Sequence, residues 1–165
     1  MIERFPAMFA AFVLFGSAMA SAEPLQVEAV MTPEEQMRLD FEDGSRRFVL
    51  LVRRRGRAAG DGLFAGAEVV EYGMHDIEPG VGGDPRGYLV FRDAAGDRAY
   101  VRWRVRAVFV RDPGGKRRLL DNGYWEVVGG TGRFAGLEGA GTLHIRPAGP
   151  VARRFVLEGE LVPAP

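Results

Sequence analysis

The sequence has no cysteine, one lysine and two histidines among its 165 residues. Without cysteine no disulfide can hold the chain together, so its stability must come from a packed core. The histidines do not show zinc-like spacing either, so neither a metal nor another cofactor is expected. Basic and acidic residues number 22 each, which gives a formal net charge of zero. Because phosphate binding needs a clear positive excess, this balance argues against nucleic acid as a partner.

The first 22 residues have the pattern of a secretory signal peptide. Arg4 supplies positive charge and a short apolar run spans residues 7–15. Small residues then provide a cleavage site after Ala22, with cleavage after Ala20 as the alternative. The run is too short to span about 30 Å of hydrocarbon, so no permanent membrane anchor is expected. The arginine bias, with much glycine, alanine and valine, suggests a GC-rich bacterial genome, so we expect a periplasmic or secreted protein.

Residues 23–165 are predicted to form a single all-β domain. Apolar residues recur with a period of two, and turn residues interrupt them at short intervals. No segment is long enough to form a helix that crosses between parallel strands, so the sheet should be antiparallel. Residues 32–35 have the form of a capping box, which predicts a short helix or turn; alternatively, a strand begins at Met37 and turns at residues 42–44. About eight strands are expected, near residues 25–31, 47–55, 67–77, 87–92, 99–110, 119–128, 143–146 and 153–161.

A glycine-rich stretch, residues 123–142, is the most distinctive feature of the sequence. Its Gly-x-Gly-x-x-Ala pattern from Gly130 formally matches a dinucleotide-binding loop, which requires a helix of several turns to follow. Only residues 133–137 intervene before further glycines break the chain, so a nucleotide site is excluded. The glycines instead predict a tight corner between two strands, with Phe134 and Leu137 closing the end of a barrel beneath it.

This stretch resembles the allene oxide cyclase and dirigent barrel superfamily. The resemblance rests on Gly-Gly-Thr-Gly, then Arg-Phe-Ala-Gly and Gly-x-Gly-Thr, and on the segment 86–98 upstream. It is closest to small exported bacterial members, most of which have no known activity. The resemblance implies an eight-stranded antiparallel barrel with one open end over a largely apolar lumen. Plant members are cyclases or control radical coupling and often form dimers or trimers, so a homo-oligomer is one option for this chain.

Aromatic residues on two predicted strands are candidates for a ligand site. Trp103 lies on the apolar face of residues 101–110, and with Trp125 it would line the lumen for a small apolar ligand. Tyr124 is a third ligand-binding candidate. The alternative is that these aromatic side chains simply fill the core, because a barrel of eight strands is just wide enough either to be filled or to hold one small ligand.

Arginines on the same strands are expected outside the barrel. Three of them, at positions 102, 104 and 106, share the face opposite Trp103. Unpaired guanidinium groups inside a lumen would be costly to desolvate, so we expect them outside with acidic partners on neighbouring strands. The arginine run 53–55 is expected to be solvated for the same reason.

Three residues are candidates for catalysis: Glu71, His75 and Glu126. Glu71 and His75 share one face of a predicted strand and could act as a proton-transfer pair. In an extended strand, however, they would lie roughly 13 Å apart, too far for a direct hydrogen bond. Ser45 is the only serine after the signal peptide, so the sequence gives little support for a serine-based catalytic triad. The sequence therefore favours a protein that binds a small apolar ligand or acts as an interaction module; the alternative is a cyclase or isomerase that uses the lumen.

Overall fold

The computed structural model describes residues 21–163, and almost all of them lie in strands or in the turns between strands. A single-turn 3-10 helix, η1 (Gly132–Phe134), precedes the eighth strand. The expected all-β class is confirmed. The strands are β1 (Glu23–Asp40), β2 (Phe48–Asp61), β3 (Glu68–Glu78), β4 (Gly82–Gly83), β5 (Arg86–Arg92), β6 (Arg98–Arg111), β7 (Arg117–Gly130), β8 (Glu138–Pro147) and β9 (Arg153–Val162).

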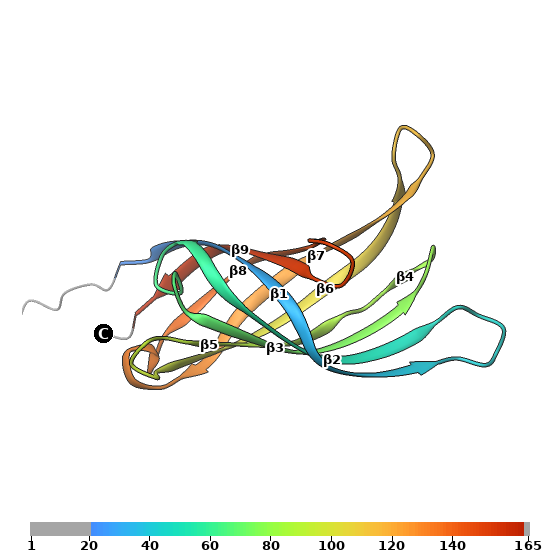
Figure 1. Cartoon of the computed structure of the whole chain (residues 1–165). Helices are drawn as coiled ribbons and strands as arrows, with labels where there is room; N and C mark the ends of the chain where they lie inside the picture. Colours follow the sequence, from blue (N-terminus) through green and yellow to red (C-terminus); the bar gives the residue numbers. More distant parts are fainter. Residues whose placement is uncertain (1–20, 164–165) are drawn as a thin grey trace, which may run out of the picture.

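Eight of these strands pair in a closed antiparallel ring (Figure 1). The ring runs β1–β2–β3–β5–β6–β7–β8–β9 and returns to β1, where Glu23 lies opposite Leu161. The two-residue strand β4 pairs with β3 and β6 at one end of the ring. The predicted eight-stranded antiparallel barrel is therefore confirmed.

Two long hairpins, β1–β2 and β6–β7, extend beyond the rest of the barrel at the end away from the chain termini, and they diverge from each other (Figure 1). β9 pairs with β1 only as far as Met31, and β8 pairs with β7 only from Asp121 to Glu126. Among the described residues, the end of β1 and the start of β7 therefore have no neighbouring strand on the side away from their hairpin partner.

The expected short helix or turn at residues 32–35 is wrong. The alternative is right in that residues 37–40 are extended and a bend follows, but the strand begins at Glu23 and not at Met37. Residues 32–35 belong to β1, where a bulge between Pro33 and Glu35 shifts the pairing with β2. Strand pairing here adds ion pairs from Glu34 to both Arg53 and Arg55. A capping box satisfies only a few hydrogen bonds of the local backbone. Pairing with the distant strand β2 is therefore more favourable than a short helix at these residues.

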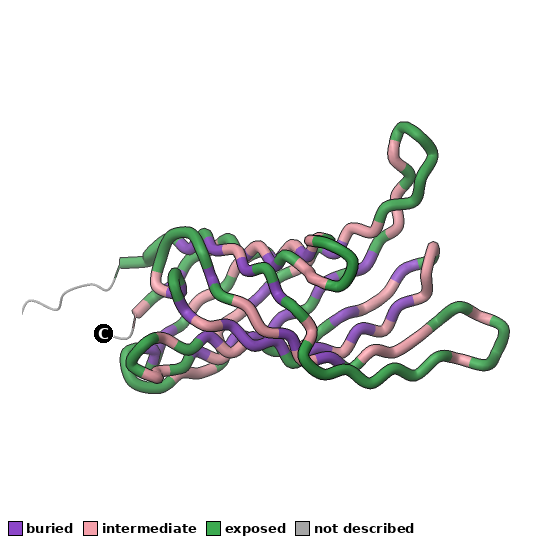
Figure 2. The backbone as a smooth tube through the Cα atoms, in the orientation of Figure 1, coloured by how far each residue is buried: buried purple, intermediate pink, exposed green. Residues whose placement is uncertain are grey.

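The core lies inside the ring, and every strand except β4 contributes buried apolar residues to it. Buried and exposed residues alternate along β6 (Figure 2), as expected for strands with one face inside a barrel. At the end that carries the glycine corner, Phe134 and Leu137 are buried, as predicted. The largest fully buried side chains are Trp103, Trp125, Phe64, Phe91, Phe134 and Phe155.

The proposed signal peptide lies outside the described residues, except for Ser21 and Ala22, and stays a prediction. Within residues 21–163, no helix has both the length and the apolar character needed to cross a membrane.

Glycines on β8 and β9 make room for an indole inside the barrel. A Cβ atom added to Gly159 would lie 2.8 Å from Cζ2 of Trp125. A Cβ atom added to the facing Gly141 would meet the carbonyl oxygen of Glu158 and lie 2.7 Å from the Cα atom of Gly159. The two strands can therefore approach each other only because both positions lack a side chain.

We expect Gly141→Ala to lower the free energy of unfolding by about 1–3 kcal/mol, because the added methyl group overpacks the wall beside Trp125. Urea titration followed by tryptophan fluorescence measures the change. Gly129→Ala is the matched control, because nothing lies within 4 Å of its added Cβ atom. Equal losses in both variants would show that crowding at Gly141 is not the cause.

Candidate functional site

Four charged or titratable side chains are buried inside the barrel: Arg54, Glu71, His75 and Asp121. They come from β2, β3 and β7, and we call them the lumen cluster. Nη1 of Arg54 donates a hydrogen bond of 2.6 Å to Oε2 of Glu71. Nε2 of His75 lies 3.0 Å from Oε1 of Glu71 and 3.1 Å from Nη1 of Arg54. Burial of charged groups is costly, so such a cluster in an otherwise apolar core requires an explanation.

The prediction that Glu71 and His75 are too far apart to interact is wrong. Their backbones are four residues apart along β3, but their side chains lean toward each other over Gly73. A Cβ atom at Gly73 would meet Oε1 of Glu71 and would lie 2.9 Å from Nε2 of His75. The missing side chain at this one position brings the carboxylate and the imidazole into direct contact.

The prediction that residues 53–55 are solvated is wrong for Arg54. Arg54 shares the inward face of β2 with Val52 and pairs across the sheet with Glu71 of β3. Arg53 and Arg55 point outward and pair with Glu34. The central arginine is therefore carried inside by strand alternation, where Glu71 compensates its charge.

Nε2 of His75 can serve only one of its two neighbours at a time. When Nε2 carries a proton, it donates to Oε1 of Glu71. When Nε2 is unprotonated, it accepts a hydrogen bond from Nη1 of Arg54 instead. The hydrogen bond that the imidazole makes in the cluster therefore depends on its tautomer.

Asp121 is buried, and its Oδ1 has no hydrogen-bond partner among residues 21–163. Burial raises the pKa of this carboxyl from 3.8 to about 6, even though the positive charges of Arg153, Arg146 and Arg54 act in the opposite direction. Nε of Arg54 is also buried without a partner. Sequence reasoning did not single out Asp121; its place on the same strand face as Trp125 was the available signal.

Apolar side chains lie beyond the cluster on the inner faces of β2, β3, β6 and β7; Ile77 is buried and the others are partly buried. Phe48 pairs with Ile77, Leu50 pairs with His75, and Phe109 pairs with Leu119 two positions beyond Asp121. Paired residues share a face of the sheet, so this group faces the same way as the cluster. We call the five residues the rim: Phe48, Leu50, Ile77, Phe109 and Leu119.

The structure separates the residues predicted from the sequence into two groups. Glu71, His75, Trp103 and Trp125 lie inside the barrel, and the rings of His75 and Trp103 have their centroids 5.7 Å apart. Trp125 donates from Nε1 to the carbonyl of Glu158, whereas Nε1 of Trp103 is buried without a partner. Their roles in ligand binding or catalysis stay predictions.

Tyr124 and Glu126 lie outside the barrel. Tyr124 is half exposed, and Glu126 accepts hydrogen bonds from Arg102 across the sheet. Arg104 likewise pairs with Asp84. The expected outward arginines with acidic partners are therefore confirmed for these two positions. Among residues 21–163, no three histidine or acidic side chains are grouped closely enough to hold a metal ion.

Comparison with known proteins shows the fold. No protein-family model matches the chain, and no curated protein does. A β-barrel-like protein from Acinetobacter baumannii is similar in structure, with a TM-score of 0.59 at 10% identity over 88% of this chain and 99% of that one. A pterocarpan synthase dirigent protein has a TM-score of 0.52 at 10% identity over 93% of this chain and 100% of its own. The resemblance to dirigent-like barrels is thus confirmed as a likeness of fold.

We expect Asp121→Asn to change how stability depends on pH. A carboxyl whose folded pKa is raised favours folding fully below pH 3.8, and this contribution is lost as the pH rises through about 6. The amide has no such penalty, so the variant should be more stable than the wild type by about 2–3 kcal/mol at pH 8 and little different at pH 4. Urea unfolding at the two pH values measures this, and a constant difference would contradict it.

Proposed function

We propose that the protein binds a small amphipathic molecule at the lumen cluster, with the apolar part of the ligand against the rim. The observation that carries the proposal is that two of the three buried side-chain polar atoms without partners among residues 21–163 belong to the lumen cluster: Oδ1 of Asp121 and Nε of Arg54. Each such atom costs roughly 1–3 kcal/mol while it stays unsatisfied. A ligand that satisfies both would recover this free energy.

The chemistry of the two atoms selects the polar group of the ligand. The ionised Asp121 carboxylate accepts a hydrogen bond, and Nε of Arg54 donates one. A hydroxyl group, as in an alcohol or phenol, can donate to the first and accept from the second. Aromatic side chains occupy the middle of the barrel, so the ligand would bind at the end of the barrel nearer the lumen cluster.

The comparison supports this assignment in general terms. Proteins named as pterocarpan synthases have the same barrel, so the fold is compatible with chemistry on small molecules. At 10% identity the likeness does not extend to individual residues.

Binding of 4-propylphenol tests the proposal. We expect saturable shifts of the Trp103 indole and Ile77 methyl NMR signals at pH 8, because the hydroxyl would join Asp121 and Arg54 while the propyl group contacts the rim. The methyl ether 4-propylanisole accepts but cannot donate, so it should bind about tenfold more weakly.

Asp121→Asn should weaken binding of the phenol and change binding of the ether little, because only the phenol can donate a hydrogen bond to the Asp121 carboxylate. Glu160→Gln, an exposed acid on β9, is the matched control. The proposal would be wrong if neither ligand perturbed Trp103 or Ile77, or if both ligands bound equally to the wild type.

Acid–base catalysis at the same cluster is the second candidate function. Two observations favour it: burial raises the pKa of the Asp121 carboxyl to about 6, and Nε2 of His75 lies 3.0 Å from Oε1 of Glu71 in the same cluster. Groups that change protonation near neutral pH are suited to move a proton to and from a substrate. Isomerase reactions that shift a proton need such a transfer.

The base-promoted ring opening of 5-nitrobenzisoxazole tests this candidate. A base removes the proton from C3, the N–O bond breaks, and 2-cyano-4-nitrophenolate forms, which absorbs visible light. We expect a protein-dependent rate that rises with pH around a midpoint of about 6 and falls at least tenfold in Asp121→Asn. A rate that Asp121→Asn leaves unchanged, or no rate above buffer, would argue against catalysis and leave binding alone.

A further inference from the structure

A second site lies on the outside of the barrel and does not depend on the proposed function of the lumen. A groove of about 910 Å³ crosses the outer faces of β1, β2, β3, β5, β6 and β7. We call it the outer groove. This volume is near the upper end of the range for small-molecule sites, roughly 300–1,000 Å³. Its lining includes the backbone at Gly73 and Gly87.

Three tyrosines form the aromatic part of the groove. Tyr72 and Tyr88 are cross-strand partners on β3 and β5, so their side chains stand side by side on the outer face. Tyr124 of β7 lies next to Arg104 in the same lining. The three are 52%, 46% and 51% exposed, which is far more than a tyrosine in a core would be. The groove therefore offers aromatic surface that the other described residues leave uncovered.

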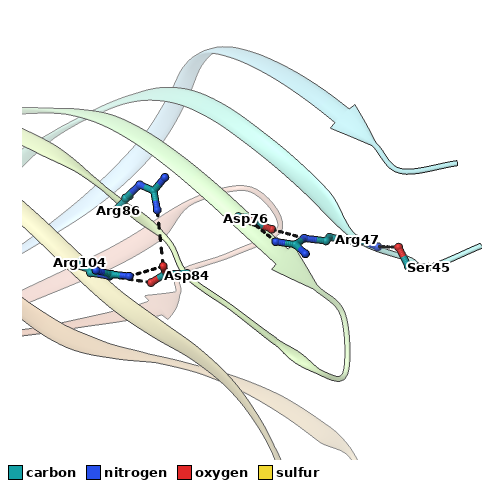
Figure 3. A network of polar contacts seen from close by, with 6 residues as sticks. All are labelled: Ser45, Arg47, Asp76, Asp84, Arg86 and Arg104. Atoms are coloured by element: carbon teal, nitrogen blue, oxygen red, sulfur yellow. Dashed lines mark hydrogen bonds and ion pairs between the residues drawn. The ribbon is translucent and has the colours of Figure 1, made fainter. Parts of the chain in front are cut away.

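The arginines beside these tyrosines already have carboxylate partners. Arg102 donates two hydrogen bonds to Glu126, at 2.9 and 2.8 Å. Arg104 donates from Nε and Nη2 to the two oxygens of Asp84, at 2.9 and 2.6 Å, and Arg86 approaches the same aspartate at 3.7 Å (Figure 3). Arg53 pairs with Glu34 at 2.7 Å. An anionic ligand would have to displace these carboxylates, so the charge pattern does not favour an anion.

These ion pairs still present a dense set of donors and acceptors at the groove surface. A guanidinium group has five N–H donors, and a carboxylate has about four acceptor positions, so each pair keeps several of both free. A neutral ligand with many hydroxyl groups can use them without breaking the pairs. The exposed tyrosine rings require in addition an apolar face on the same ligand.

We propose that the outer groove binds a neutral oligosaccharide. A pyranose ring has apolar C–H faces that stack on an aromatic ring, and it has hydroxyl groups at its edge that can reach Arg102, Arg104 and their carboxylates. The row of consecutive cross-strand partners Arg53, Tyr72, Tyr88 and Arg102 gives the groove the elongated form that a sugar chain needs.

Calorimetric titration with cellohexaose, xylohexaose and N-acetylchitohexaose tests the proposal, with hexagalacturonate as the anionic comparison. At least one neutral hexasaccharide should bind saturably, and hexagalacturonate should bind more weakly. Tyr88→Ala should weaken binding about tenfold by removing a stacking surface, and Tyr88→Phe should keep most of the affinity.

Two control variants separate this site from the rest of the molecule. Tyr100→Ala removes an outward tyrosine of β6 that does not line the groove, and Asp121→Asn alters only the lumen. Both should bind the sugar like the wild type, whatever the outcome for the lumen ligand. No neutral hexasaccharide binding at millimolar concentration, or affinity that Tyr88→Ala leaves unchanged, would overturn the proposal.

Self-association is the competing outcome, because tyrosine, arginine and methionine are also common in contacts between proteins. Sedimentation velocity of the wild type and Tyr88→Ala distinguishes the two. A concentration-dependent dimer that Tyr88→Ala abolishes would assign the groove to a protein contact and overturn the sugar proposal. A monomer in both, with sugar binding lost in Tyr88→Ala, would support it.

Discussion

Closure of the sheet between β1 and β9 is the constraint on which the rest of the structure depends. Once the ring is closed, each strand within the barrel is paired on both sides, and each side chain faces either the lumen or the solvent. A shift of one residue in any strand would exchange the two faces along its whole length. The buried pair of Trp103 and Trp125, which are cross-strand partners, fixes that alternation for β6 and β7.

The parts of the fold that sequence could predict are those that depend on local patterns. Alternation along residues 101–110 correctly placed Trp103 inside and Arg102 and Arg104 outside, because period two is a property of one strand alone. The glycine corner was predictable for a similar reason: Gly132 has a φ of +53°, and Phe134, two residues later, is buried in the core. In both places the residues that determine the local structure lie within a few sequence positions of the side chain that they place.

The parts that sequence could not predict depend on which strands become neighbours. Arg54 belongs inside only because β2 pairs with β3 in a register that sets it opposite Glu71. Residues 32–35 are extended only because β2 pairs with them. Adjacent residues of a strand face opposite sides, so Tyr124 and Trp125 could not both line the lumen, and only the register decides which of them does.

The pairing of Glu23 with Leu161 has one more consequence. The first and last strands are antiparallel neighbours, and the described chain ends lie at the same end of the barrel (Figure 1). A turn of a few residues would join them as it joins any other hairpin. The barrel is thus a ring of antiparallel strand pairs in which no turn joins β9 to β1. A circular permutant that joins these two strands and is opened at the turn of residues 93–97 would keep all the strand pairs. The order of strands around the ring, rather than the residue at which the chain starts, specifies this fold.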